Sequence, residues 1–151
     1  MVSAFLDTSA LFPGVWSSEG GARMILRLGE AGAIRIAISP RVLAEVEGVL
    51  RRKAPEALGA LALILDGSQV EVVPEAPSDR VNDCYALTRH AGDAEIIAAA
   101  WQAAVDYFVT LDREHFLNNA AVRGAVPFPL GTPGDFLAWY RGRLTYSTSR
   151  E

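Results

Sequence analysis

Short apolar runs rich in β-branched residues alternate along the chain with longer segments in which apolar residues recur at helical spacing. The short runs at 2–6, 34–38, 70–73 and 107–110 predict strands. The longer segments predict helices at 20–28, 40–53, 55–65, 79–90 and 94–104, with a final helix from 132 toward 141. Prolines in the run at 126–130 predict a last strand at a sheet edge, because they would interrupt a central one. Strands that alternate with helices favour an α/β fold, with a mostly parallel sheet covered on both faces.

Capping residues place two of the helix boundaries. Ser39 followed by Pro40 gives an N-cap and then a proline at the first helical position. Gly92 is expected to break the helical pattern that precedes it, and Asp93 is expected to cap the helix that follows.

Length and composition set the domain count. The chain has 151 residues, of which 50% are hydrophobic, enough for one globular domain with a sizeable core. With no internal repeat or low-complexity linker, we expect one domain over 1–143 and a polar C-terminal tail over 144–151. The apolar runs are too short to span a bilayer, and the N-terminus does not resemble a signal peptide, so no membrane partner is expected. Cys84 is the only cysteine, which suits a cytoplasmic location.

The net charge of −4 argues against a protein that coats nucleic acid through bulk positive charge. It does not exclude an enzyme that meets phosphate at a local site, because bound metal ions reverse the sign of an acidic pocket. The positive charge is almost all arginine, which makes bidentate contacts with phosphate. Arg41 and Arg113 are candidates for such contacts, and a run of basic residues at 51–53 is more typical of a solvated helix end.

Four acidic residues stand where a parallel α/β sheet places its functional sites. Asp7 ends the first strand and Asp112 follows the strand at 107–110, and sites in such sheets lie at the carboxyl ends of strands. Glu45 and Asp93 lie near the starts of helices that point toward the same edge. Each acid alone has an ordinary interpretation as a cap, a turn residue or a solvated charge. Together they would repel one another unless cations were present, so their convergence would indicate a metal site.

The second acid has a competitor. Glu45 and Glu47 lie two residues apart on the same predicted helix. Residues at that spacing do not share a helix face, so only one of them is expected to serve the site. We choose Glu45 for its position after the segment SPRVLA, and the choice between the two stays open at this point.

Four segments in this order resemble the PIN domain family of metal-dependent nucleases, in particular the VapC-like toxins of toxin–antitoxin pairs. They are FLDTSALF, ISPRVLAEVEGVL, GDAEIIAAAWQAAVDYFVTLDREHF and PLGTPGDFLAWY, which together span nearly the whole chain. The first and third are the most specific. Ser9 stands where many relatives have asparagine, and residues 55–83 match nothing specific in the family.

The resemblance implies a three-layer α/β sandwich whose central, mostly parallel twisted sheet has about four to five strands. It implies that one or two Mg²⁺ or Mn²⁺ ions are bound by Asp7, Glu45, Asp93 and Asp112. A metal-activated water would then cleave RNA, leaving a 5′-phosphate and a 3′-hydroxyl. Ser9 and Thr110 would support the site through their hydroxyls, and Arg41 and Arg113 would contact the substrate. The implied partners are RNA, a cognate antitoxin and a second copy of the chain. His90 and His115 match no metal position of the family and are interpreted as surface or structural residues.

Two other functions remain open. A phosphoryl-transfer enzyme of the haloacid dehalogenase or response-regulator kind also carries an aspartate after its first strand. Ser9 stands where such phosphatases have a second aspartate, and no later apolar run ends in the lysine that both classes need. A non-catalytic PIN-like module that binds RNA or protein is the second alternative. Such modules usually lack some of the acids, whereas all four candidates are present here. The choice between RNA and DNA as the substrate is also open.

Overall fold

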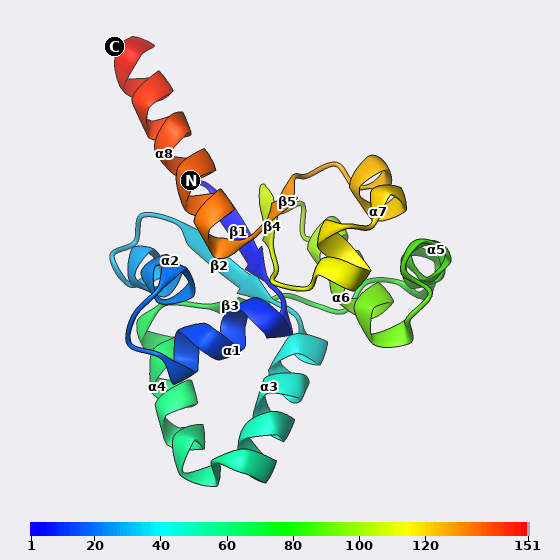
Figure 1. Cartoon of the computed structure of the whole chain (residues 1–151), viewed down its shortest axis with the longest axis horizontal. Helices are drawn as coiled ribbons and strands as arrows, with labels where there is room; N and C mark the ends of the chain where they lie inside the picture. Colours follow the sequence, from blue (N-terminus) through cyan, green and yellow to red (C-terminus); the bar gives the residue numbers. More distant parts are fainter. Residues whose placement is uncertain (151) are drawn as a thin grey trace.

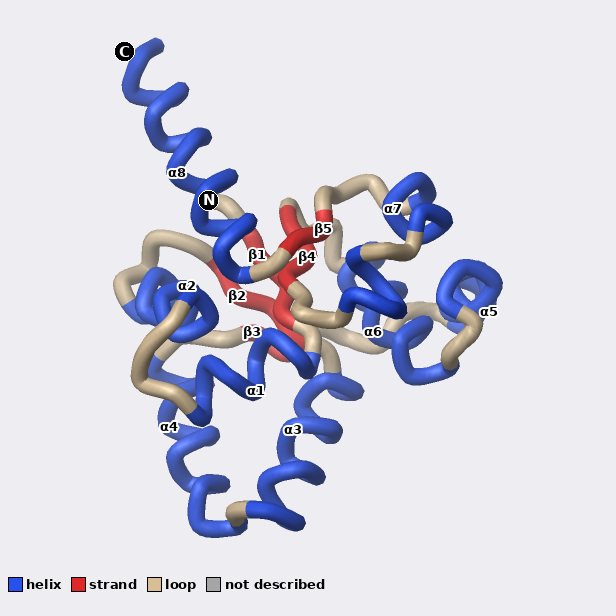
Figure 2. Tube along the Cα trace, viewed as in Figure 1, coloured by secondary structure: helices blue, strands red, loops and turns tan. Residues whose placement is uncertain are grey.

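A five-stranded sheet forms the centre of the computed structural model, which describes residues 1–150, with side chains described as far as residue 146 (Figures 1 and 2). The strands are β1 (Ser3–Leu6), β2 (Arg35–Ile38), β3 (Glu71–Val72), β4 (Tyr107–Val109) and β5 (Leu130–Gly131). Their order is β3-β2-β1-β4-β5, and every pair of neighbours is parallel. The predicted α/β class and parallel sheet are confirmed.

Helices flank the sheet, with α1 to α4 on one side of the strands and α5 to α7 on the other (Figure 1). The α-helices are α1 (Thr8–Trp16), α2 (Gly21–Glu30), α3 (Pro40–Lys53), α4 (Leu58–Gly67), α5 (Ser78–Thr88), α6 (Ala91–Gln102), α7 (Ala120–Ala125) and α8 (Pro133–Arg150). A 3-10 turn (Pro55–Ala57) precedes α4, and a π-helix (Arg113–Leu117) follows β4. None of the helices in the described part of the chain is long and apolar enough to cross a membrane.

The two central strands end at the same level, and this alignment positions the candidate site. Leu6 pairs with Val109 in the register of β1 and β4, and the amide of Asp7 donates to the carbonyl of Val109 at 3.2 Å. Both strands are buried among apolar side chains, and the ring of Phe5 stacks on that of Phe108 at 5.4 Å. The residues that follow the two strands therefore lie side by side at the edge of a rigid core.

Helix α1 is absent from the sequence-based prediction. The chain enters it directly after Asp7, whose side chain caps it by accepting a hydrogen bond from the amide of Ala10 at 3.0 Å. Short polar residues such as those at 7–9 favour turns and helix N-caps alike, so the pattern alone left both possible.

The boundary between α5 and α6 differs from the prediction. Helix α5 ends at Thr88, and Arg89 adopts a left-handed conformation with φ of 57°. His90 then caps α6, since its Nδ1 accepts a hydrogen bond from the amide of Asp93 at 3.2 Å. The predicted break at Gly92 and cap at Asp93 are therefore wrong, because both residues lie inside the first turn of α6.

The C-terminal part also departs from the prediction. The last strand is the short pair Leu130–Gly131, after both prolines, although it does lie at the sheet edge as expected. Helix α8 continues to Arg150 instead of ending near Arg141, so the described part of the expected tail at 144–151 is helical. The first turns of α8 pack against the core through Phe136, and the later part of the helix extends away from the rest of the molecule (Figure 1). Residue 151 lies outside the described part.

Candidate metal-binding site

Asp7 lies at the carboxyl end of β1 and is 3% exposed. Its Oδ1 accepts hydrogen bonds from the Ser9 hydroxyl at 2.7 Å and the Ala10 amide at 3.0 Å, and its Oδ2 accepts one from the Thr110 hydroxyl at 2.5 Å. The pKa of Asp7 is raised to about 6, chiefly by burial and to a smaller extent by the neighbouring charge of Asp112, while these three hydrogen bonds limit the rise. Asp7 is thus fixed in place but carries its negative charge at a cost that a cation would offset.

The hydroxyls of Ser9 and Thr110 join the ends of the two central strands. Thr110 is fully buried, and its Oγ1 also accepts a hydrogen bond from the amide of Asp112 at 3.0 Å. The Ser9 hydroxyl accepts one from the amide of Leu111 at 2.8 Å. Both side chains therefore hold Asp7 and the backbone that leads to Asp112 in one arrangement.

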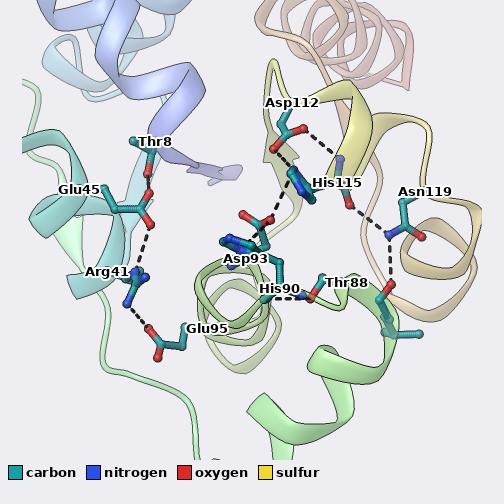
Figure 3. A network of polar contacts seen from close by, with 11 residues as sticks. Thr8, Arg41, Glu45, Thr88, His90, Asp93, Glu95, Asp112, His115 and Asn119 are labelled. Carbon is teal, nitrogen blue, oxygen red and sulfur yellow. Dashed lines mark hydrogen bonds and ion pairs between the residues drawn. The ribbon is translucent and has the colours of Figure 1, made fainter. Parts of the chain in front are cut away.

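A second part of the site brings together Asp93, Asp112 and His115 (Figure 3). Asp93 projects from the first turn of α6, and Asp112 caps the π-helix by accepting a hydrogen bond from the amide of His115 at 2.9 Å. Each of these side chains offers a possible ligand atom, and the three atoms lie within 4.8 Å of one another. Ligands around a single cation are spaced in this way, so the group has the dimensions of a metal site.

One oxygen of Asp93 lacks a hydrogen-bond donor. Its Oδ2 is buried and has no hydrogen-bond partner among the described residues. His90 Nδ1 lies 3.2 Å away, but this nitrogen already accepts the amide of Asp93 and carries no proton when the ring is neutral. Burial raises the pKa of Asp93, and the charges of Asp112 and Glu45 add to the rise while both histidines oppose it. A bound cation would satisfy this oxygen, so the residues present fit a metal ion.

Glu45 completes the acidic cluster from α3. Its Oε2 accepts a hydrogen bond from the Thr8 hydroxyl at 2.5 Å, and its Oε1 lies 3.1 Å from Arg41 Nε (Figure 3). Glu47 instead pairs with Arg51 at 3.3 Å, one helical turn further along. Of the two glutamates, Glu45 is the one directed toward α1 and the other acids.

The four predicted acids are thus connected by pairwise electrostatic interactions. The charge of Asp112 acts on Asp7, and the charges of Asp112 and Glu45 both act on Asp93. Asp7 and Glu45 flank the tighter group of Asp93, Asp112 and His115 and do not belong to it. The structure thus brings Asp93 and Asp112 together with one imidazole, with Asp7 and Glu45 at the flanks of this group.

The predicted arginines occupy different positions. Arg41 bridges two acids, Glu45 and Glu95, with Nη1 at 3.4 Å from Glu95 Oε2, and remains partly exposed. Arg113 begins the π-helix directly after Asp112, and its side chain is exposed. His115 is the site residue that the sequence interpretation missed. The available signal was its spacing from Asp112, which places both side chains on one side of a helical turn.

Comparison with known proteins gives a family match. A family model described as a PIN domain matches residues 3–114. No curated protein matches the chain.

Solved structures share the fold. VapBC2 from Rickettsia felis, bound to a promoter DNA fragment, has a TM-score of 0.67 and 17% identity, covering 87% of this chain and 98% of that one. DNA-bound VapBC from Salmonella typhimurium has a TM-score of 0.63 and 20% identity, covering 88% and 99%. VapC20 from Mycobacterium tuberculosis, described as a sarcin–ricin loop cleaving toxin, has a TM-score of 0.54 and 20% identity, covering 76% and 94%. At these identities the similarity is one of fold.

Proposed function

Because this chain belongs to the PIN domain family, we propose that it is a metal-dependent endoribonuclease that hydrolyses RNA phosphodiester bonds as the VapC-like toxin of a toxin–antitoxin pair. The observation that carries the proposal is the buried, unpartnered Oδ2 of Asp93 within a cluster of mutually repelling carboxylates. Such a cluster is costly without cations, and hard divalent cations prefer carboxylate oxygens. The similarity in fold to a toxin described as cleaving the sarcin–ricin loop supports RNA as the substrate.

The metal would be Mg²⁺ or Mn²⁺, held chiefly by Asp93 and Asp112, with Asp7 and Glu45 at the flanks. When bound, one or two such ions supply charge stabilisation at the scissile phosphate and an activated water. The residues of the chain set the geometry for this chemistry. Three hydrogen bonds keep Asp7 in one position, and the Thr8 hydroxyl does the same for Glu45.

The two arginines are placed to receive the substrate backbone. Arg41 shares its guanidinium between two partly exposed acids, and a phosphate oxygen can replace either of them without leaving a fully buried charge unpaired. Arg113 is exposed directly beside Asp112. Both contacts would neutralise phosphates next to the cleaved bond and so position the RNA against the acidic cluster.

An antitoxin is the proposed protein partner. The fold is shared with toxins solved as VapBC complexes, and the acidic cluster offers carboxylates to a basic segment of such a partner. A second copy of the chain is a further proposed partner. Measuring the mass of the purified chain in solution, with and without a co-expressed antitoxin, tests both.

Mn²⁺-dependent cleavage of a pool of single-stranded and structured RNAs tests the proposed activity. The wild type is compared with Asp7→Asn and Asp93→Asn, and Glu47→Gln serves as the matched acid outside the cluster. We expect both aspartate variants to lose cleavage while they remain folded, and Glu47→Gln to retain it. Equal degradation by all four proteins would identify a contaminating nuclease and refute the proposal. Failure of the wild type to bind Mn²⁺ would favour a non-catalytic binding module.

A further inference from the structure

We propose that His115 supplies a nitrogen ligand to the cation held by Asp93 and Asp112, and that this ligand gives the site a preference for Mn²⁺ over Mg²⁺. The inference rests on the proposed metal-dependent function and adds a specificity-determining residue to it. The resemblance to the PIN family assigns His115 no role.

The geometry places one imidazole nitrogen between two carboxylates. His115 Nδ1 lies 2.9 Å from Asp112 Oδ2 and 3.5 Å from Asp93 Oδ2 (Figure 3). The second of these oxygens is the buried one that has no hydrogen-bond partner within the described part of the chain. A cation placed among the three atoms would therefore satisfy Asp93 and would replace the His115–Asp112 contact with ligation by both side chains.

The backbone around His115 is fixed, which is the condition for a well-defined ligand. Asn119 donates hydrogen bonds from its amide nitrogen to the carbonyls of His115 and Leu87, both at 3.1 Å. This ties the π-helix to the end of α5 (Figure 3). The next residue, Phe116, is 1% exposed and packs on Phe108 of the central strand with ring centroids 5.0 Å apart. His115 is thus held between the core and α5.

His90 lies beside His115 but has a different role. The two rings are 5.4 Å apart and tilted by 44°. The Nδ1 lone pair of His90 is engaged by the amide of Asp93 at the start of α6, so this nitrogen is not free to bind a cation. The neighbouring, more exposed histidine therefore provides a control, with the same ring close to the same acids but with its Nδ1 already engaged.

A nitrogen ligand changes the metal preference. Mg²⁺ prefers an all-oxygen octahedral shell and retains several waters, whereas Mn²⁺, a first-row transition ion that also takes oxygen ligands, accepts an imidazole nitrogen more readily than Mg²⁺ does. A centre of two carboxylates and one imidazole thus favours Mn²⁺ over Mg²⁺ more than carboxylates alone would. Removal of the imidazole should weaken Mn²⁺ binding much more than Mg²⁺ binding.

The direct test is pulsed electron paramagnetic resonance of the full chain loaded with Mn²⁺ alone, without RNA. The wild type should show ¹⁴N modulation of the Mn²⁺ echo, and labelling with ¹⁵N-histidine should replace it with the ¹⁵N pattern. Only two histidines occur in the sequence, His90 and His115. His115→Asn should abolish the modulation, and His90→Asn, which keeps a capping side chain, should leave it unchanged.

Metal affinities measured by calorimetry complete the test. In His115→Asn the affinity for Mn²⁺ should fall about tenfold or more, as expected for loss of a ligand, while the affinity for Mg²⁺ should change by less than about threefold. Equal losses for both ions, or an unlabelled wild type without ¹⁴N modulation, would overturn the inference. If the wild type shows no ¹⁴N modulation but still cleaves RNA with Mn²⁺, only this inference fails. If the wild type binds no Mn²⁺ at all, the proposed function is refuted as well.

Discussion

The Thr110 hydroxyl donates a hydrogen bond to Asp7 Oδ2 at 2.5 Å from the end of the neighbouring strand. The Thr110 Oγ1 also accepts a hydrogen bond from the backbone amide of Asp112 at 3.0 Å, so one buried hydroxyl contacts both acids that follow the two central strands. Because a hydrogen bond to an ionised carboxylate lowers its pKa, Thr110 opposes the rise that burial imposes on Asp7. Thr110 therefore favours the ionised form of Asp7 and also holds its side chain in place.

Replacing Thr110 with valine tests this role, because the shape is kept and the hydroxyl is lost. Two buried groups, Asp7 Oδ2 and the Asp112 amide, would lose a partner, so the free energy of unfolding should fall by about 1–3 kcal/mol. The acid limb of the pH–rate profile for cleavage should move to higher pH, since Asp7 would lose a contact that lowers its pKa. Thr110→Ser, which retains the hydroxyl, should leave the limb in place. An unmoved limb in the valine variant would show that Thr110 does not control the ionisation of Asp7.

The stability of the metal-free protein should depend on pH through Asp7. Its folded-state pKa of about 6 lies above the ordinary value of 3.8, so the folded protein keeps a proton that the unfolded chain has lost. The free energy of unfolding should therefore fall as pH rises from about 4 to 6, by up to about 3 kcal/mol, and remain low above that range.

Asp7→Asn removes this dependence. In chelator at about pH 8 the variant should melt at a higher temperature than the wild type, and Mn²⁺ should stabilise it less. Glu56→Gln, which changes an exposed acid outside the site, should leave the pH dependence as it is. Denaturant unfolding across the pH range measures both effects, and a wild type whose stability rises between pH 4 and 6 would refute the role given to Asp7.

Glu45 and Glu47 should differ sharply in function. Glu45 contacts Thr8 and acts on Asp93, whereas Glu47 pairs with Arg51. Glu45→Gln should therefore reduce kcat for RNA cleavage by about tenfold or more, the scale expected for loss of a positioned charge in a metal centre. Glu47→Gln should change it by less than about twofold, because a solvated ion pair contributes little. A large loss of kcat in Glu47→Gln and a small one in Glu45→Gln would instead identify Glu47 as the glutamate that serves the site.

Alanine substitutions at two helical glycines should have opposite effects on the free energy of unfolding. A Cβ at Gly29 in α2 would lie 2.5 Å from Ile36 Cδ1 and 2.6 Å from the carbonyl oxygen of Ser68, so Gly29→Ala should cost about 1–3 kcal/mol. Gly59 in α4 has open space around the same position, and Gly59→Ala should stabilise the protein by about 0.5–1 kcal/mol. Thermal melts of both variants at one pH measure the difference, and a stabilising Gly29→Ala would show that α2 and β2 are less closely packed.

The sequence predicted the sheet and the positions of Asp7 and Asp112 because strand length and alternation with helices determine which residues end parallel strands. It did not predict α1, since the residues that cap a helix also favour turns. The left-handed Arg89, with φ of 57°, has no clear sequence signature. Its conformation let His90, instead of Asp93, cap α6.

The histidines show a further limit of the sequence pattern. The three-residue spacing from Asp112 was the one signal for His115, but the contact itself is made through a π-helix, a rare geometry that the sequence does not indicate. The buried oxygen of Asp93 likewise depends on packing between α6 and the loop after β4, which involves residues far apart in the chain. The four acids could be anticipated from their positions, but their imidazole neighbours required the structure.

The ends of the RNA fragments give the most direct test of metal-dependent hydrolysis at this site. Attack by a metal-activated water leaves a 5′-phosphate and a 3′-hydroxyl, whereas acid–base catalysis by a histidine pair such as His90 and His115 would use the ribose 2′-hydroxyl and leave a 2′,3′-cyclic phosphate. We expect 5′-phosphate ends that form only with Mn²⁺ or Mg²⁺ and disappear in Asp93→Asn. Cyclic phosphate ends formed in chelator would mean that the carboxylate cluster is not the catalytic centre.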